Sequence, residues 1–310
     1  MTSRIAIIDC GTNTFHLLIG EKKEGQFSIL FKEKLPVKIG EGGISKGIIT
    51  PEAEKRAIQT LTNYKEIATQ YGVNEIFAFA TSAFRNARNS DDIVRKVREK
   101  TGIKIKVISG ESEAELIFEG IKSAIALDKE PVLVMDIGGG SVEFIIGNDQ
   151  SIFWSRSYEI GAQRLLDRFH DTEPISKNSL QLLEEYLGTQ LDELIKQLKK
   201  HQAKTLIGSS GTFDTLSDIY CQKYGIEKSE NAVEVPFTLN AFEEIHHKII
   251  NSSREERLHI PGMLAMRVDM IVVASALIDF ILNNHAFNQI RVSTYAMKEG
   301  IMSRIIKNQL

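Results

Sequence analysis

Short apolar runs alternate with amphipathic stretches along the chain, and this pattern predicts its strands and helices. A continuous apolar run that ends at Asp9 is typical of a buried strand. A longer amphipathic stretch predicts a helix over 50–72, with Thr50 as its N-cap and Gly72 at its end. The first strands are expected over 4–9, 15–21 and 26–34.

The alternation continues through the first half of the chain and indicates an α/β sheet. Two further apolar runs each precede an amphipathic stretch, as in a chain that passes repeatedly from strand to helix. The strands are expected over 75–83 and 103–109, and the helices over 91–100 and 111–126.

The second half repeats this order of strands and helices. The segment ALDKEP separates the halves, so we expect domains over 1–126 and 127–310, with the last helix, 296–310, able to pack back onto the first. The expected strands are 131–136, 142–148, 151–161 and 289–294, and 204–212 is expected to be a strand that runs into a glycine turn. The expected helices are 162–169, 177–200, 212–224, 240–251, 267–284 and 295–307.

Two glycine turns, one in each half, resemble each other. The segment DCGTNTFHLLIG (9–20) aligns with DIGGGSVEFIIG (136–147), so that Asp9 matches Asp136 and His16 matches Glu143. Such a turn exposes N–H groups that cradle phosphate, and its aspartate suits Mg²⁺. One copy alone is more simply a β-hairpin turn. Two copies favour two similar domains, each with a phosphate loop at a shared cleft.

Two other segments carry candidate chemistry beside a simpler structural explanation. The small-residue turn 208–212 precedes a helix, whose N-terminal amides bind anions well, although a tight strand–helix turn has the same composition. Glu113 shares an apolar helix face with Leu116 and Ile117, which places a carboxylate at the edge of an inward stripe. An acidic residue in a first helical turn also stabilises the helix dipole without any catalytic role.

Basic residues also lie at the ends of predicted elements. Arg85 and Arg88 follow a strand and could fork onto phosphate oxygens, or be surface charges. Arg267 begins an apolar helix, where an ion pair with Asp269 is the default expectation. His16 follows the first turn, and a structural, hydrogen-bonded histidine is the default there.

Composition excludes several classes of protein. The chain has 42% hydrophobic and 25% charged residues and a net charge of −3, so nothing global indicates nucleic acid or membrane partners. Two scattered cysteines, Cys10 and Cys221, suggest a reducing compartment. The N-terminus shows no signal segment, and the longest apolar stretch, 270–282, is too short to span a bilayer. We therefore expect a cytoplasmic protein.

Taken together, the motifs resemble the exopolyphosphatase / guanosine pentaphosphate phosphohydrolase (Ppx/GppA) family of the actin-like ATPase superfamily. The resemblance covers essentially the whole chain, and its most specific part is SGESEAELI followed by DIGGGSVEF. The remaining segments that carry it, in chain order, are IAIIDCGTNTFHLLIGE, FATSAFRNARN, IGSSGTFDTL, MRVDMIVVASALI and STYAMKEGIM.

The resemblance implies a fold and a reaction. The fold would be two actin-like (ribonuclease H-like) α/β domains with mixed sheets flanked by helices and an active-site cleft between them. The reaction would be release of terminal orthophosphate from polyphosphate, or of the 5′ γ-phosphate from guanosine pentaphosphate, with Mg²⁺ or Mn²⁺ as cofactor. A homodimer is a family-level expectation only.

The resemblance also implies roles for individual residues. Glu113 matches the general base, Asp136 and Glu143 the positions that organise metal and water, and Arg85 a substrate-phosphate arginine. Asp9 is a further metal candidate. The implied phosphate contacts are Gly11, Thr12, Asn13, Thr14, Gly138, Gly139, Gly140, Ser141, Gly208, Ser209, Ser210, Gly211, Thr212 and Arg267.

The chain departs from the family pattern in two respects. The first loop carries Cys10, Thr12 and Thr14 where members often have Leu and Ser, which leaves the cradle intact. Many members have a further helical region after the core, whereas this sequence ends at Leu310, so we interpret it as the short two-domain form. That form puts processive action on long chains in doubt.

Two other functions stay open at the level of sequence. A kinase or ATPase of the actin-like superfamily would share the two-loop plan, because a fold alone does not decide chemistry. A non-catalytic polyphosphate or nucleotide sensor would use the site only for binding. The sequence does not choose between polyphosphate and guanosine pentaphosphate, and it sets neither chain length, metal nor the role of His16.

Overall fold

The computed structural model describes residues 3–23, 26–229 and 231–310. The chain divides into two compact units, one formed by Met1–Gly120 with Met297–Leu310 and the other by Ile121–Ala296. Each unit has its own mixed sheet flanked by helices, which confirms the α/β fold class expected from the sequence. The functional domain limits drawn from the sequence stay a prediction.

The sheet of the first unit has the strand order β3-β2-β1-β4-β5. β1 (Ser3–Cys10) pairs antiparallel with β2 (Phe15–Lys23), which pairs antiparallel with β3 (Gln26–Leu35). On its other side β1 runs parallel to β4 (Glu75–Ala80), and β4 runs parallel to β5 (Ile105–Val107). The carboxyl ends of β1 and β4 therefore lie at one edge of the sheet.

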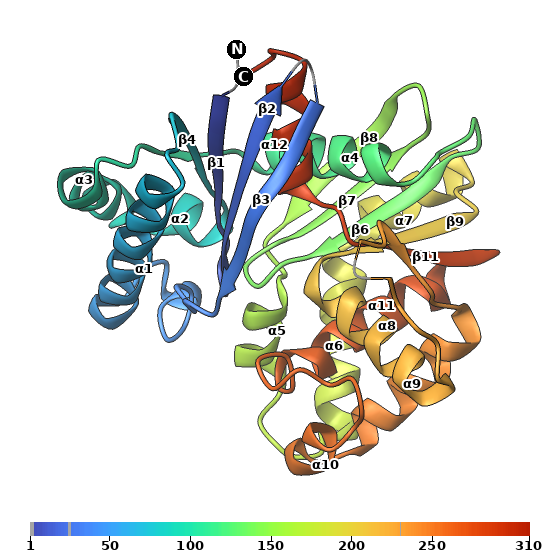
Figure 1. The fold of residues 1–310 in the computed structure, drawn as a ribbon. Helices are drawn as coiled ribbons and strands as arrows, with labels where there is room; N and C mark the ends of the chain where they lie inside the picture. Colours follow the sequence, from blue (N-terminus) through green and yellow to red (C-terminus); the bar gives the residue numbers. More distant parts are fainter. Residues whose placement is uncertain (1–2, 24–25, 230) are drawn as a thin grey trace. The chain divides into compact units, whose positions relative to one another are not determined.

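Helices cover both faces of this sheet, which explains the uninterrupted apolar run of β1. Ala6 and Ile8 belong to the core under α1 (Pro51–Gln70), whereas Ile5 and Ile7 are buried on the opposite face. α1 and α3 (Ser90–Thr101) lie on one side, and α12 (Met297–Ile306) lies on the other (Figure 1). The C-terminal helix thus completes the first unit.

The sheet of the second unit has the order β10-β11-β9-β6-β7-β8. β6 (Val132–Ile137) pairs antiparallel with β7 (Val142–Gly147), which pairs antiparallel with β8 (Ile152–Tyr158). β9 (Thr205–Ser209) runs parallel to both β6 and β11 (Gln289–Ser293), and the short β10 (Glu234–Val235) pairs antiparallel with β11. This order places the end of β9 directly beside the end of β6.

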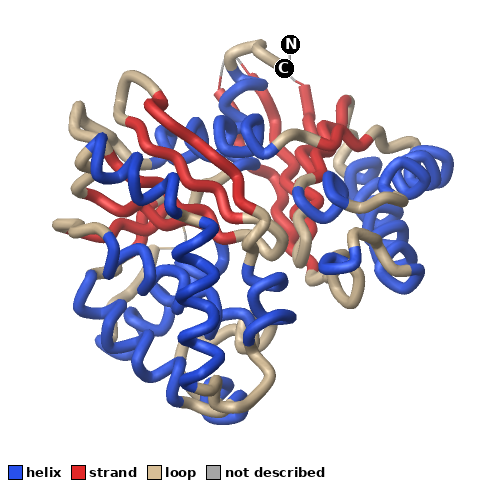
Figure 2. The backbone as a smooth tube through the Cα atoms, turned by 180° about the vertical axis from the view of Figure 1, so that it is seen from behind, coloured by secondary structure: helices blue, strands red, loops and turns tan. Residues whose placement is uncertain are grey.

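The largest core of the protein forms between this sheet and its helices. α11 (Met270–Asn284) is apolar on most of its surface and, among the described residues, packs most extensively against four other helices, so it lies at the centre of the helical layer. Figure 2 shows helices of this unit gathered against one side of the strands. The four helices around α11 are α5 (Ala162–Phe169), α6 (Lys177–Gln190), α8 (Ser210–Tyr224) and α9 (Leu239–Asn251).

The structure corrects the sequence prediction in a few places. β4 ends at Ala80, and residues 82–86 form a short helix, α2 (Ser82–Asn86), instead of the end of a strand. The helix expected over 177–200 is two helices, because a new first turn with acidic residues begins α7 (Asp192–His201). α10 (Arg254–Leu258) was not predicted, although its capping box, Ser253 with Glu256, is visible in the sequence.

Candidate active site

The first glycine turn joins β1 to β2 in the first unit. The backbone N–H of Gly11 donates to the carbonyl of Thr14 over 3.1 Å and closes the turn. Asp9 and His16 lie opposite each other, one pair before the end of the two strands at the turn. The His16 Nε2 atom lies 3.2 Å from the hydroxyl of Thr14. Three turn residues are buried: Thr12, Asn13 and Thr14.

The second glycine turn joins β6 to β7 in the same way. The N–H of Gly138 donates to the carbonyl of Ser141 over 3.0 Å, and Asp136 lies opposite Glu143. A Cβ atom on Gly138 would lie 2.9 Å from the Ser141 carbonyl oxygen, so the closed turn requires glycine. Equivalent strand pairing and the same closing hydrogen bond show that the repeat in sequence is a repeat in structure.

The third small-residue turn meets the second one at Asp136. β9 places Ser209 beside Asp136 in the parallel pairing of the two strands. The hydroxyl of Ser209 donates to Oδ2 of Asp136 over 2.5 Å, and the hydroxyl of Ser210 reaches both carboxylate oxygens at 2.8 and 2.9 Å. Ser210 has a positive φ of 69°, a costly conformation for a serine, at the start of α8. The two serine hydroxyls expected on phosphate therefore bond to the carboxylate.

Arg267 is buried against this third turn. Only 7% of the residue is exposed, and a Cβ atom on Gly211 would lie 2.1 Å from its Nη2. Its buried Nε has no hydrogen-bond partner among the described residues. Burial lowers the pKa of Arg267, while Asp214 and Asp136 act in the opposite direction. The guanidinium therefore lies at the start of α8.

The ion pair expected between Arg267 and Asp269 is wrong. Asp269 instead accepts a hydrogen bond from Nε of Arg254 over 2.7 Å. Arg267 is close to Asp269 in sequence, but Arg254, the first residue of α10, is the arginine that contacts it. The backbone turn before α11 leaves Arg267 facing Gly211.

Asp136 and Glu143 fit a hard divalent cation. Directly opposite residues of an antiparallel pair project from the same face of a sheet, so both carboxylates lie on one side of β6 and β7. Glu143 is 1% exposed and accepts a hydrogen bond from Ser157 of β8 over 2.7 Å. Within 3–23, 26–229 and 231–310, no three His, Cys, Asp or Glu residues group as a metal cage. Two carboxylates suit Mg²⁺, which usually keeps several waters and binds substrate phosphate oxygens.

In the first unit, the candidate base Glu113 pairs with the candidate phosphate arginine Arg85. Nη1 of Arg85 lies 2.9 Å from Oε2 of Glu113 and 3.2 Å from the carbonyl of Ile108. Glu113 is buried in the first turn of α4 (Gly110–Ala124), whereas Glu111 and Glu115 are exposed. The carboxylate of Glu113 therefore has a charged donor from α2 at a fixed place in the first turn of α4.

Arg85 and Asp9 come from neighbouring strands of the same sheet. Arg85 lies on α2, directly after β4, and Asp9 lies near the end of β1. Because β1 and β4 are parallel, both residues belong to one edge of the first sheet. The sequence placed Arg85 at a strand end, and the structure moves it into the helix that follows.

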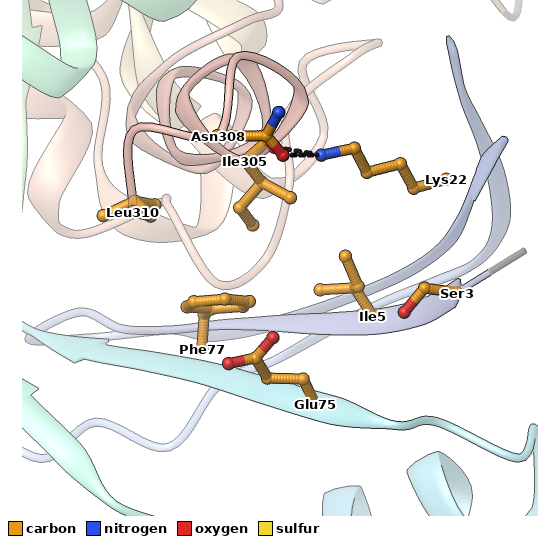
Figure 3. Close-up of a pocket in the computed structure, with 8 residues that line it drawn as sticks. All are labelled: Ser3, Ile5, Lys22, Glu75, Phe77, Ile305, Asn308 and Leu310. Atoms are coloured by element: carbon orange, nitrogen blue, oxygen red, sulfur yellow. Dashed lines mark hydrogen bonds between the residues drawn. The ribbon is translucent and has the colours of Figure 1, made fainter. Parts of the chain in front are cut away.

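A cavity of about 360 Å³ in the first unit lies away from these residues. It opens at the amino ends of β1 and β4, beside Ser3 and Phe77, and is closed by Ile305 of α12 (Figure 3). Lys22 donates to the carbonyl of Ile305 over 2.6 Å and to Asn308 over 2.7 Å. The cavity is therefore a seam under α12, at the opposite end of the strands from Asp9.

The sequence interpretation missed two kinds of residue that support the candidate site. Ser157 contacts Glu143 only because β8 pairs with β7 in this register. Gly161 and Arg164 pack against the second glycine turn. The only sequence signal for this contact was a glycine between a strand and a helix.

No helix among the described residues combines the length and the apolar character needed to cross a bilayer.

Comparison with known proteins places this architecture in a family. A family model described as the Ppx/GppA phosphatase family matches residues 18–309. Exopolyphosphatase 1 of Mycobacterium bovis is 27% identical over 310 residues, which cover 99% of this chain and 89% of that protein. Exopolyphosphatase 1 of Mycobacterium leprae is 26% identical over 310 residues, with 99% and 90% covered.

Solved structures agree with the family match. The crystal structure of an exopolyphosphatase from Cytophaga hutchinsonii matches with a TM-score of 0.95 and 40% identity, covering 99% of this chain and 98% of that one. The Ppx/GppA family member from Aquifex aeolicus has the same fold, with a TM-score of 0.80 at 22% identity and coverage of 100% and 99%. The chain therefore belongs to the Ppx/GppA phosphatase family.

Proposed function

We propose that the protein is an exopolyphosphatase that releases terminal orthophosphate from inorganic polyphosphate by metal-assisted hydrolysis. The observation that carries this proposal is the pair Asp136 and Glu143, opposite each other beside a closed glycine turn and an anion-type helix start. The names of the relatives from Mycobacterium and Cytophaga support polyphosphate as substrate.

Phosphate binding is the role of the glycine turns and of Arg267. Exposed backbone N–H groups and the N-terminus of α8 attract phosphate oxygens, and a buried guanidinium strengthens that attraction in a site of low polarity. Arg267 is suited to this role because it is buried and its Nε has no hydrogen-bond partner in the described part of the chain. The first turn, with Gly11 and Thr14, offers the same type of cradle.

Asp136 and Glu143 would bind the divalent cation, with Asp9 as a further candidate. A bound Mg²⁺ or Mn²⁺ neutralises charge that builds on the phosphate oxygens. Ser209 and Ser210 fix the orientation of the Asp136 carboxylate through their hydrogen bonds.

Glu113 acts as the general base in this proposal. It orients the attacking water and takes its proton, and the ion pair with Arg85 holds the carboxylate in place. Arg85 serves both the carboxylate and substrate phosphate, since a guanidinium has several donors in a fixed fork. His16, which contacts Thr14, has no assigned part in the chemistry.

The test is phosphate release measured side by side on short polyphosphate, long polyphosphate and guanosine pentaphosphate with Mg²⁺. We expect release from at least one polyphosphate, and release from guanosine pentaphosphate would add the second activity of the family. Incubation with ATP and candidate acceptors tests the kinase alternative. Tight binding of polyphosphate with no release from any of these compounds would reject the hydrolase and favour a sensor. A homodimer and the absence of nucleic acid or membrane partners stay predictions.

A further inference from the structure

Backbone N–H groups at the start of α5 donate hydrogen bonds to the carbonyl groups of the second glycine turn. Ala162 N–H donates to the Gly138 carbonyl over 2.9 Å, and Gln163 N–H donates to the Gly139 carbonyl over 2.9 Å. Gly161 N–H donates to the Gly140 carbonyl over 3.2 Å. The first N–H groups of a helix usually lack a partner within the helix. Here the turn supplies those partners.

These bonds fix which way the peptide N–H groups of the turn point. In a planar trans peptide, the C=O of one residue and the N–H of the next point in opposite directions. When the three glycine carbonyls face α5, the N–H groups of Gly139, Gly140 and Ser141 face away from it. Three successive N–H groups directed to one side form the kind of concave site that binds phosphate.

Position 161 requires glycine because the backbone of the glycine turn lies too close to it for a side chain. Its φ of −60° and ψ of 159° suit almost any residue, so backbone conformation does not demand glycine here. A Cβ atom at this position would lie 2.4 Å from the carbonyl carbon of Gly140 and 2.5 Å from that of Gly139. Both are backbone atoms, so a side chain would push the turn away from α5.

Arg164 adds a charged donor to the same contact. Its Nε donates to the Gly140 carbonyl over 2.8 Å, and its Nη2 lies 3.1 Å from the carboxylate of Glu159. The arginine side chain is 19% exposed, so much of it is packed. A charged donor to a carbonyl is stronger than a neutral one.

We propose that Gly161 and Arg164 are positioning residues that keep the turn 138–141 in its phosphate-binding conformation. The proposal rests on the proposed function of this turn as a phosphate site. Arg164 acts through its hydrogen bond to the Gly140 carbonyl. Substrate affinity therefore depends on a residue that lies outside the glycine turn.

The variant Arg164→Met tests this inference, and Arg168→Met is its matched control. Arg168 lies on the same helix, is exposed, and has its guanidinium carbon 4.2 Å from the centre of the Tyr186 ring. Its substitution therefore removes the same charge without changing a contact to the turn. Two quantities are measured in Mg²⁺: the Kd of inorganic triphosphate on the Glu113→Gln background, and KM and kcat for polyphosphate. Thermal melting is followed for each variant.

We expect Arg164→Met to raise the Kd and KM about tenfold, as for loss of one charge-assisted hydrogen bond, with kcat changed less than about threefold. Arg168→Met should change none of these values. Arg164→Lys, which retains a donor, should recover part of the affinity, whereas a purely structural role would change melting and leave the Kd alone. Gly161→Ala should weaken binding further, and Arg164→Met keeps the test decisive if that variant does not fold.

Three outcomes separate this inference from the proposed function. If Arg164→Met binds triphosphate as tightly as Arg168→Met does, the positioning role is rejected and the hydrolase proposal stands. If the wild type binds triphosphate but releases no phosphate, the hydrolase proposal fails, and the positioning role is supported by a tenfold rise in Kd. If the wild type does not bind triphosphate, both proposals fail.

Discussion

Arg85 and Glu113 are 28 residues apart in the sequence and form an ion pair of 2.9 Å in the first unit. Arg85 comes from α2 and Glu113 from the first turn of α4, so two separate elements set the geometry of the ion pair. Only 10% of the Glu113 side chain and 18% of the Arg85 side chain are exposed. Such a pair holds one carboxylate at a defined place, as a general base requires.

Glu113→Gln should therefore lose turnover but retain substrate binding. Loss of a positioned base typically costs ~10²–10⁴-fold in rate, and glutamine keeps the size and hydrogen bonding of the side chain. The measurement is kcat for phosphate release, with the Kd of triphosphate as the binding reference. Glu111→Gln is the control, because Glu111 is exposed on the same helical turn. Near-normal kcat in Glu113→Gln would assign the base elsewhere.

Asp136→Asn should weaken binding of the divalent cation before any substrate is added. The change removes one of two carboxylates on the same face of the sheet and disturbs the hydrogen bonds from Ser209 and Ser210. Mn²⁺ titration followed by electron paramagnetic resonance measures this without turnover, and an increase of at least about tenfold in Kd is expected. Asp149→Asn is the control on the same unit. Equal Mn²⁺ affinity of Asp136→Asn and wild type would remove Asp136 from the metal site.

Gly211→Ala should lower anion affinity by displacing Arg267. The new methyl group would lie 2.1 Å from Nη2, and the end of a long side chain moves more easily than backbone. We expect the Kd of triphosphate to rise by roughly ten- to a hundredfold while the protein stays folded. Gly188→Ala, in the interior of α6 with nothing within 4 Å, is the control and should be about 0.5–1 kcal/mol more stable. Unchanged affinity in Gly211→Ala would show that Arg267 does not contact the anion.

His170 should make the protein less stable as the pH falls below 6.5. Burial lowers the pKa of His170; Glu173, Asp171 and Asp269 act against burial, and Arg257 acts with it. The unfolded chain therefore takes up a proton at a pH where the folded chain does not. The stability that the lowered pKa of His170 contributes is complete above pH 6.5. It is lost progressively as the pH drops from 6.5 towards the pKa of His170 in the folded chain.

The measurement for His170 is denaturant unfolding at pH 8 and pH 5.5. His170→Asn should lose part of the pH dependence of the wild type, because its side chain does not titrate. His247→Asn serves as the control, since His247 is exposed on α9. An identical pH dependence in wild type and His170→Asn would contradict the assignment.

Local signals explain why so many elements could be predicted. α1 begins as expected, with Thr50 accepting a hydrogen bond from Ala53 N–H over 3.3 Å. The paired glycine turns were recognisable because a buried strand, a tight turn and a second strand are all encoded within about twelve residues. Burial of Glu113 followed from the spacing of its helical neighbours.

The sequence alone thus determined most of the strands and helices, the two repeated turns and the residues that carry candidate chemistry, because each depends on neighbours along the chain. The tertiary structure decided which of these residues meet. Ser209 reaches Asp136 only because β9 pairs with β6, and Asp269 pairs with Arg254 instead of Arg267. The contact of Gly161 with Gly140 likewise depends on the packing of α5. Pairing between distant strands and the approach of one backbone to another have no periodic signature, so only the folded chain reveals them.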